Sequence, residues 1–161
     1  MERISAPPLP EKSRALRATL AGGTLAGVLD LSAAFVNGAF NGVSPVRVTQ
    51  AIASGLLGAE SYKGGAATVF LGILLHFFIA LTATAVYYSA SRRFSFLINQ
   101  PLISGALYGI AVYLLMTFIV LPLSSFTGKM PTAFFPIAVG LVIHILFVGL
   151  PIALAVRRFA K

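Results

Sequence analysis

Four side chains able to exchange protons or bind an ion lie inside otherwise apolar segments of this 161-residue chain: Asp30, His76, Tyr113 and His144. Ionisable groups are costly in hydrocarbon, so those that occur there usually face the interior of a helix bundle or a cavity. A carboxyl group beside an imidazole can pass a proton, and a tyrosine hydroxyl can donate to either group. The chemistry open to this chain therefore depends on whether its fold brings the four residues together.

The depth and the neighbours of these residues favour such an arrangement. Counted from the segment ends assigned below to the outer side, Asp30, His76 and His144 are each ten residues deep, and Tyr113 is nine deep. At about 1.5 Å per residue, all four lie within one helical turn of the same depth. Small residues mark the faces on which membrane helices approach one another. Glycines accompany every one of the polar residues along its predicted face: Gly23, Gly27, Gly72, Gly105, Gly109 and Gly140.

The predicted polar core cluster has three open interpretations. Asp30 can accept hydrogen bonds from a histidine or tyrosine and so hold helices together, at about 0.6–2 kcal/mol per contact. Asp30 and a neighbouring histidine can instead form a proton or ion site. Zinc also uses such ligands, but their spacing matches no metal motif, so we predict no metal site and no cofactor. No nucleophile elbow or HExxH motif is present, which argues against hydrolytic catalysis.

Four long apolar segments must position these side chains. Hydrophobic residues make up 58% of the chain and charged residues 10%, whereas soluble domains carry about 25% charged residues. Each segment is long enough to cross about 30 Å of hydrocarbon as a helix and too continuously apolar for a barrel strand. The predicted spans are 18–40, 66–90, 101–122 and 134–156. We therefore expect an all-α membrane protein, a four-transmembrane-helix bundle.

The basic residues predict how this bundle is oriented. Of the 12 Lys and Arg residues, nine lie in the N-terminal tail, the loop between the second and third spans, and the C-terminus, and three lie in the other loops. Cytoplasmic loops are enriched in Lys and Arg, so both termini are predicted to be cytoplasmic. Topology then accounts for the net charge of +8, and no nucleic-acid partner is expected. The expected partners are the lipid bilayer and further copies of the chain, because four helices enclose little volume.

The segments outside the spans are interpreted as follows. Residues 1–17 are predicted to form a flexible basic tail with a helical lead-in from about Glu11, and 18–161 a single membrane domain. A helix over 45–57, capped by Ser44, is too short to span, so we expect it to lie at the outer interface, with a re-entrant segment as the alternative. The chain has no Trp, so Tyr87 and Tyr88 are expected at the inner interface. It has no Cys, which excludes disulfides and Cys-ligated metals.

Several short motifs carry a resemblance to a group of proteins. They are the Gly-rich first span with Asp30, Ser44-Pro45-Val46-Arg47, Leu75-His76-Phe77, Tyr108-Gly109, Leu121-Pro122, and His144 followed by Gly149-Leu150-Pro151. With them the chain resembles small uncharacterised four-span bacterial inner-membrane proteins. These proteins have no known activity, so the resemblance implies only a multi-pass protein of the inner (cytoplasmic) membrane.

Three hypotheses for the function follow. The first is a small transporter or channel-like subunit that uses the buried Asp/His/Tyr cluster. The second is a structural or accessory membrane protein whose polar cluster only packs helices. The third is a membrane enzyme that acts on a lipid or quinone through its histidines. We expect an enzyme less than the other two, and the sequence leaves the substrate open.

Overall fold

The computed structural model of the chain describes residues 10–159. Within this range the secondary structure is entirely helical. Four of the helices are long and apolar enough to cross a membrane. The predicted all-α, four-span fold is thus confirmed, and the protein is a multi-pass membrane protein. Residues 1–9 of the predicted tail lie outside the described range.

The four spans agree closely with their predicted ranges. The first is α1 (Glu11–Phe40) and the second is α3 (Gly65–Ser91). The third consists of α5 (Pro101–Leu115), the π-helical segment η2 (Met116–Val120) and α6 (Leu121–Leu123). The fourth consists of α7 (Phe134–Ile143), the π-helical segment η3 (His144–Gly149) and α8 (Leu150–Phe159). The largest difference is at the start, where α1 begins at Glu11 and the predicted lead-in is continuous with the span.

The two π-helical segments have a common local cause. Pro122 follows η2 and Pro151 follows η3, each within two residues of the end of the segment. Proline lacks the N–H that a helix needs, and its ring clashes with the carbonyl four residues earlier. A wider turn relieves this clash, and such π-bulges within α-helices often lie at functional sites. The prolines therefore explain why both spans change their winding midway.

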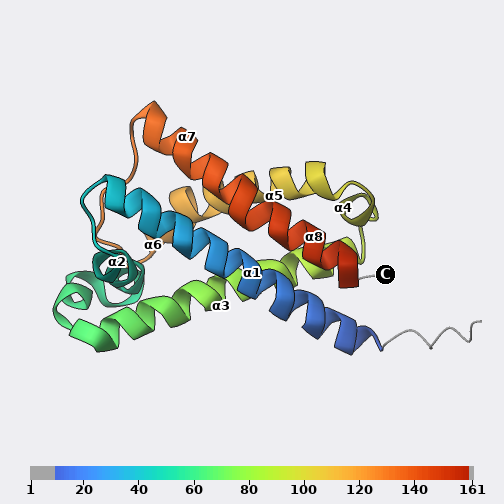
Figure 1. Cartoon of the computed structure of the whole chain (residues 1–161), viewed down its shortest axis with the longest axis horizontal. Helices are drawn as coiled ribbons and strands as arrows, with labels where there is room; N and C mark the ends of the chain where they lie inside the picture. Colours follow the sequence, from blue (N-terminus) through green and yellow to red (C-terminus); the bar gives the residue numbers. More distant parts are fainter. Residues whose placement is uncertain (1–9, 160–161) are drawn as a thin grey trace, which may run out of the picture.

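Three short elements complete the chain: α2 (Pro45–Leu57), the 3-10 helix η1 (Gly58–Lys63) and α4 (Phe96–Asn99). The predicted helix over 45–57 is confirmed as α2, and Ser44 Oγ accepts the N–H of Arg47 at 3.3 Å as its cap. Figure 1 looks nearly along the axis of α2, whereas the spans run across the picture. Thus α2 lies across one end of the bundle, with its polar residues Thr49, Gln50 and Ser54 buried. A backbone carbonyl of α2, that of Thr49, faces Gly72 of α3.

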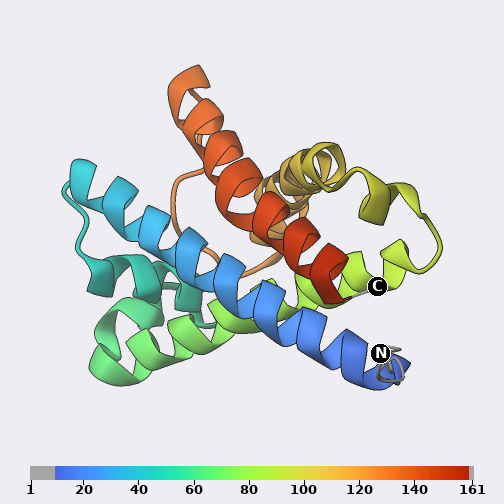
Figure 2. The same ribbon diagram turned by 45° about the vertical axis from the view of Figure 1, so that its right-hand side comes forward.

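The two ends of the bundle are packed differently. We call the end that holds the start of α1, α4 and the end of α8 the terminal end, and the opposite end the α2 end. The terminal half contains the buried core of Ala18, Tyr87, Ile152, Ala153 and Val156. Toward the α2 end, α7 diverges from α1 in both views (Figures 1 and 2), and α7 has no buried residue. The bundle is therefore closed at the terminal end and splayed at the α2 end.

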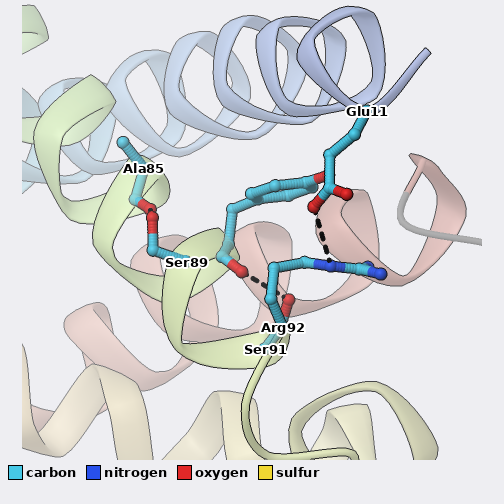
Figure 3. A network of polar contacts seen from close by, with 6 residues as sticks. Glu11, Ala85, Ser89, Ser91 and Arg92 are labelled. Carbon is cyan, nitrogen blue, oxygen red and sulfur yellow. Dashed lines mark hydrogen bonds and ion pairs between the residues drawn. The ribbon is translucent and has the colours of Figure 1, made fainter.

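An ion pair links α1 to the end of α3 at the terminal end. Arg92 Nε lies 3.3 Å from Glu11 Oε1 (Figure 3). The guanidinium of Arg92 also lies over the ring of Tyr88, 5.7 Å from its centroid. Ser91 and Ser89 in the same turn donate to the carbonyls of Tyr88 and Ala85, so the last turn of α3 is held by its own hydroxyls. Both charged side chains of the pair reach solvent.

Candidate functional site

A cavity of about 800 Å³ occupies the α2 half of the bundle. Its walls come from α1, α2, α3, the third span and η3, and most of the lining side chains are apolar. Asn41 and Lys129 line it near the α2 end and are exposed, so the cavity reaches the surface there. Asp30, His76 and His144 all belong to its lining.

Asp30 lies on a stripe of α1 that faces the cavity. Ala34, Asn37 and Asn41 line the same cavity four, seven and eleven residues further on, which is the spacing of one helix face. Asp30 has no hydrogen bond or ion pair with any residue of the range 10–159. Its oxygens are also not among the fully enclosed unpartnered atoms, which belong to Arg14, Ser61, Tyr88 and Tyr113. The carboxyl group is therefore reachable from the cavity and unused by the fold.

His76 joins α3 to α1 next to Asp30. Its Nε2 lies 2.9 Å from the carbonyl oxygen of Gly27, three residues before Asp30. A carbonyl only accepts, so Nε2 carries the proton of this contact, and in the neutral ring Nδ1 is left as an acceptor. No described residue bonds Nδ1, and Nδ1 is not fully enclosed. His76 thus presents an accessible lone pair from a ring that the backbone holds in place.

His144 is the first residue of η3 and repeats this arrangement on the opposite side. Its Nδ1 lies 2.9 Å from the carbonyl oxygen of Gly140 in the preceding turn. By the same reasoning Nδ1 donates, and Nε2 of the neutral ring remains an acceptor without a partner in the described range. The ring of Tyr113 packs edge-on against the imidazole, with centroids 5.2 Å apart and planes at 71°. The contact with α5 therefore fixes the second histidine as well.

Tyr113 itself does not reach the cavity. It is buried, packs behind His144 and against Gly140, and its hydroxyl has no hydrogen-bond partner among residues 10–159. The structure therefore brings three of the four predicted cluster residues to the lining of one cavity, and the fourth packs against His144 outside that lining. Within the described chain no three His, Cys, Asp or Glu side chains could hold one metal ion. The polar residues are spread along a cavity and do not surround a single point.

The six predicted packing glycines all lie where a neighbour approaches closely: Gly23, Gly27, Gly72, Gly105, Gly109 and Gly140. A Cβ atom at any of them would come within 3.0 Å of a neighbouring atom. The partners differ in kind, however. Gly105 and Gly109 face the backbone of the fourth span, Gly72 faces α2, and Gly140 faces the ring of Tyr113. At these positions glycine thus allows either a neighbouring backbone or an aromatic ring to approach closely.

Sequence reasoning missed a pair of tyrosines that lie next to the cavity lining, between α3 and α5. Tyr108 donates to the carbonyl of Ala83 at 2.7 Å, and Ala83 lines the cavity. The hydroxyl of Tyr87 lies 2.8 Å from Ser104 Oγ and donates to the carbonyl of Leu97 at 2.9 Å. The two rings meet with centroids 4.9 Å apart. We call Tyr87 and Tyr108 the tyrosine bridge, because they join α3 to α5.

The tyrosine bridge corrects one expectation from the sequence. Tyr87 and Tyr88 were expected at the inner membrane interface, yet they are only 1% and 5% exposed. Tyr87 turns inward because the loop after α3 brings the Leu97 carbonyl within reach of its hydroxyl. The spacing of Ser104 and Tyr108, four residues apart on one face of α5, is the sequence signal that could have indicated this polar contact.

The geometry thus defines a cavity that reaches the surface at the α2 end, an unused carboxyl group and two histidines held by backbone carbonyls. Comparison of the chain with models of known protein families, with curated proteins and with solved structures finds no match. The resemblance noted from short motifs stays an expectation, and the function has to be argued from the cavity itself.

Proposed function

We propose that this protein is a small transporter or carrier of the bacterial inner membrane that binds a largely apolar solute in the cavity. The observation that carries the proposal is the cavity of about 800 Å³ with Asp30, His76 and His144 in its wall. Binding sites for small molecules typically measure 300–1,000 Å³ and combine an apolar lining with a few placed polar groups. The cavity has this size and this composition.

The hydrogen bonds favour this proposal over a purely structural role. If the polar cluster served only for packing, Asp30 would accept a hydrogen bond from a histidine or tyrosine of another helix. Instead both histidines donate to backbone carbonyls, and Asp30 is left without a partner in the described range. Ionisable groups inside membrane helices normally pair with a partner, so an unused carboxyl group there favours an external partner.

The distribution of charge supports an orientation for the transporter. Arg92, Arg93, Arg157 and Arg158 lie at the terminal end, which we therefore place in the cytoplasm. The mouth of the cavity then opens to the outer side, and the tyrosine bridge lies between the cavity and the cytoplasmic side. Alternating access would require the tyrosine bridge to open, and the π-helical segments η2 and η3 are the parts of the wall best suited to change their winding.

Single-cysteine variants test this proposal cleanly, because the chain contains no native cysteine. Three positions on α1 provide the site and two controls: Ala34 lines the cavity, Leu25 is half exposed on the outer surface of the bundle, and Ala18 is fully buried. A charged thiol reagent that cannot cross membranes is applied to right-side-out and to inverted vesicles. We expect Ala34→Cys to react only in right-side-out vesicles, and Leu25→Cys and Ala18→Cys in neither.

A bulky residue in the cavity tests binding directly. Ala34→Phe should displace any bound solute, whereas Leu25→Phe changes only the surface that faces lipid. The proposed function is overturned if Ala34→Cys is unreactive from both sides. It is equally overturned if no solute of the set described below binds the wild type better than it binds Ala34→Phe.

A further inference from the structure

The ionisable side chains that the spans contribute to the cavity lining share one hydrogen-bonding character. Asp30, His76 Nδ1 and His144 Nε2 can all accept, and the donor nitrogens of both histidines are already engaged with backbone carbonyls. Both rings belong to the walls contributed by the spans. Like Asp30, the two histidines therefore present hydrogen-bond acceptors to the cavity.

The polar residues nearer the mouth do not change this pattern. The amide of Asn41 donates to the carbonyl of Asn37, and the hydroxyl of Ser124 donates to the carbonyl of Leu121. The donors that remain in the lining are the second N–H of the Asn41 amide, the amide of Asn37, two turns from Asp30 along α1, and the ammonium of Lys129. Lys129 is exposed, so water and salt screen its charge.

The charges of the lining favour the same kind of ligand head as its hydrogen-bonding groups do, namely a donor. Asp30 is the only acidic residue in the lining, and the titratable groups that share the cavity with it are His76, His144 and Lys129. A donor head with positive charge would satisfy the carboxylate and remain compatible with neutral imidazoles. An anionic head would meet the carboxylate of Asp30 as a like charge, which is costly where water is scarce.

We infer that the ligand is a small apolar molecule with a protonated amine head, which points toward Asp30 while the apolar body packs against the wall near Ile79, Val112 and Met116. This inference rests on the proposed function, because it names the substrate class of the same cavity. A charge-assisted hydrogen bond between an ammonium group and a carboxylate is about twice as strong as a neutral one, which makes the head group the main determinant of selectivity.

Three probes with one apolar body separate the alternatives. They are 1-naphthylmethylamine, 1-naphthalenemethanol and 1-naphthoate, which carry a cationic, a neutral and an anionic head. Binding is measured by equilibrium dialysis against the full-length protein in lipid nanodiscs, with empty nanodiscs to subtract partition into lipid. We expect the amine to bind at least about tenfold more tightly than the alcohol, and the carboxylate not at all. The wild type alone thus tests the inference.

Variants identify the residue responsible. Asp30→Asn should weaken binding of the amine by roughly ten- to hundredfold, which corresponds to the loss of a hydrogen bond to a charged group. Binding of the alcohol should change by less than about threefold. Glu60→Gln, which removes an exposed carboxylate outside the cavity, should leave both unchanged. Circular dichroism confirms that each variant is folded before binding is compared.

The outcomes distinguish this inference from the function on which it rests. Equal binding of amine and alcohol, or preferred binding of the carboxylate, with loss of binding in Ala34→Phe, overturns the amine head and leaves the carrier function intact. An amine affinity that is unchanged in folded Asp30→Asn overturns the assignment to Asp30. Either binding of none of the three probes or an unreactive Ala34→Cys variant overturns the proposed function itself.

Discussion

The terminal half and the α2 half of this bundle are built from the same four apolar spans, yet one is closed and the other hollow. Ala18, Ile152 and Val156 in the terminal half are fully buried. In the α2 half, α7 has no buried residue, and a cavity of about 800 Å³ separates the helices. Lipid is as apolar as the side chains, so hydrophobicity alone cannot bring membrane helices together. The difference must come from how well the helices fit.

Small residues explain that fit. In the terminal half a Cβ atom at Gly22 would lie 2.9 Å from a methyl group of Thr84 and 3.2 Å from that of Ala155, so α1, α3 and α8 meet at one glycine. The outer turn of α7 instead carries Phe134 and Phe135, which are 86% and 76% exposed. This turn carries no glycine, so no close backbone approach draws it to its neighbours. The hollow half is therefore a consequence of side-chain size, and it is also where the ionisable residues line a cavity.

The largest expected effect comes from adding one methyl group at Gly149, where the third and fourth spans are in backbone contact. A Cβ at Gly149 would collide with the carbonyl oxygen of Gly105, so Gly149→Ala should destabilise the protein by about 3 kcal/mol because two backbones must separate. Gly55→Ala is the matched change in the cavity wall, where the nearest atom is Ser124 Oγ at 3.7 Å. Alanine favours a helix by up to about 1 kcal/mol over glycine, so this variant should be neutral or stabilised. Thermal unfolding followed by circular dichroism measures both, and equal losses would contradict the comparison.

Removal of side-chain volume should show the same asymmetry with a smaller effect. Ile152 is fully buried in the terminal half, and Ile152→Ala should cost about 2 kcal/mol because a new void deprives its neighbours of contacts. Ile79 already borders the cavity, so Ile79→Ala only enlarges an existing space and should cost less than about 1 kcal/mol. The free energy of unfolding in detergent is the measurement. A larger loss for Ile79→Ala than for Ile152→Ala would contradict the comparison, because it would mean that Ile79 is closely packed and does not border an open space.

Two buried tyrosines allow the same substitution to be compared with and without a hydrogen bond. Tyr87→Phe removes the hydroxyl that bonds Leu97 and Ser104, and should destabilise the protein by about 1 kcal/mol. Tyr113→Phe removes a hydroxyl that has no partner in the described chain, and should be neutral or slightly stabilising. Unfolding of the two variants in parallel provides the test. A clear loss for Tyr113→Phe would mean that its hydroxyl finds a partner in another state of the protein.

The fold could be predicted because the solvent and the local chemistry determine it. Hydrocarbon requires apolar helices about 20 residues long, and this length makes the four spans visible in the sequence. The start of α2 was predictable because Ser44 and Pro45 cap a helix through contacts within one turn. The π-helical turns were not predicted. Pro122 and Pro151 indicate a disturbed turn before each proline, but the same residue can produce either a kink or a π-helical turn, and the sequence does not distinguish the two.

The candidate site could be predicted only in part. Helical periodicity indicated the faces that carry Asp30, His76 and His144, and all three line one cavity. Periodicity cannot tell whether residues on inward faces touch, because the separation of the helices depends on residues elsewhere, such as Gly22. It also could not place Tyr113 behind His144, nor bring Tyr87 to the carbonyl of Leu97, since both contacts depend on the relative rotation of two helices.

The smallest expected effect tests whether an ion pair or the packing of the helices keeps the terminal end closed. Glu11→Gln removes the ion pair with Arg92, in which the side chains are 61% and 34% exposed. Exposed pairs are screened by solvent, so the free energy of unfolding should change by less than about 0.5 kcal/mol, and this difference should shrink further as salt is added. Arg92 keeps its position over the Tyr88 ring, and a cysteine at position 18 should stay protected from thiol reagents. If Glu11→Gln exposed that cysteine, the ion pair between Glu11 and Arg92 would be what keeps the terminal half closed. Close packing at glycines would then no longer explain the difference between the two halves.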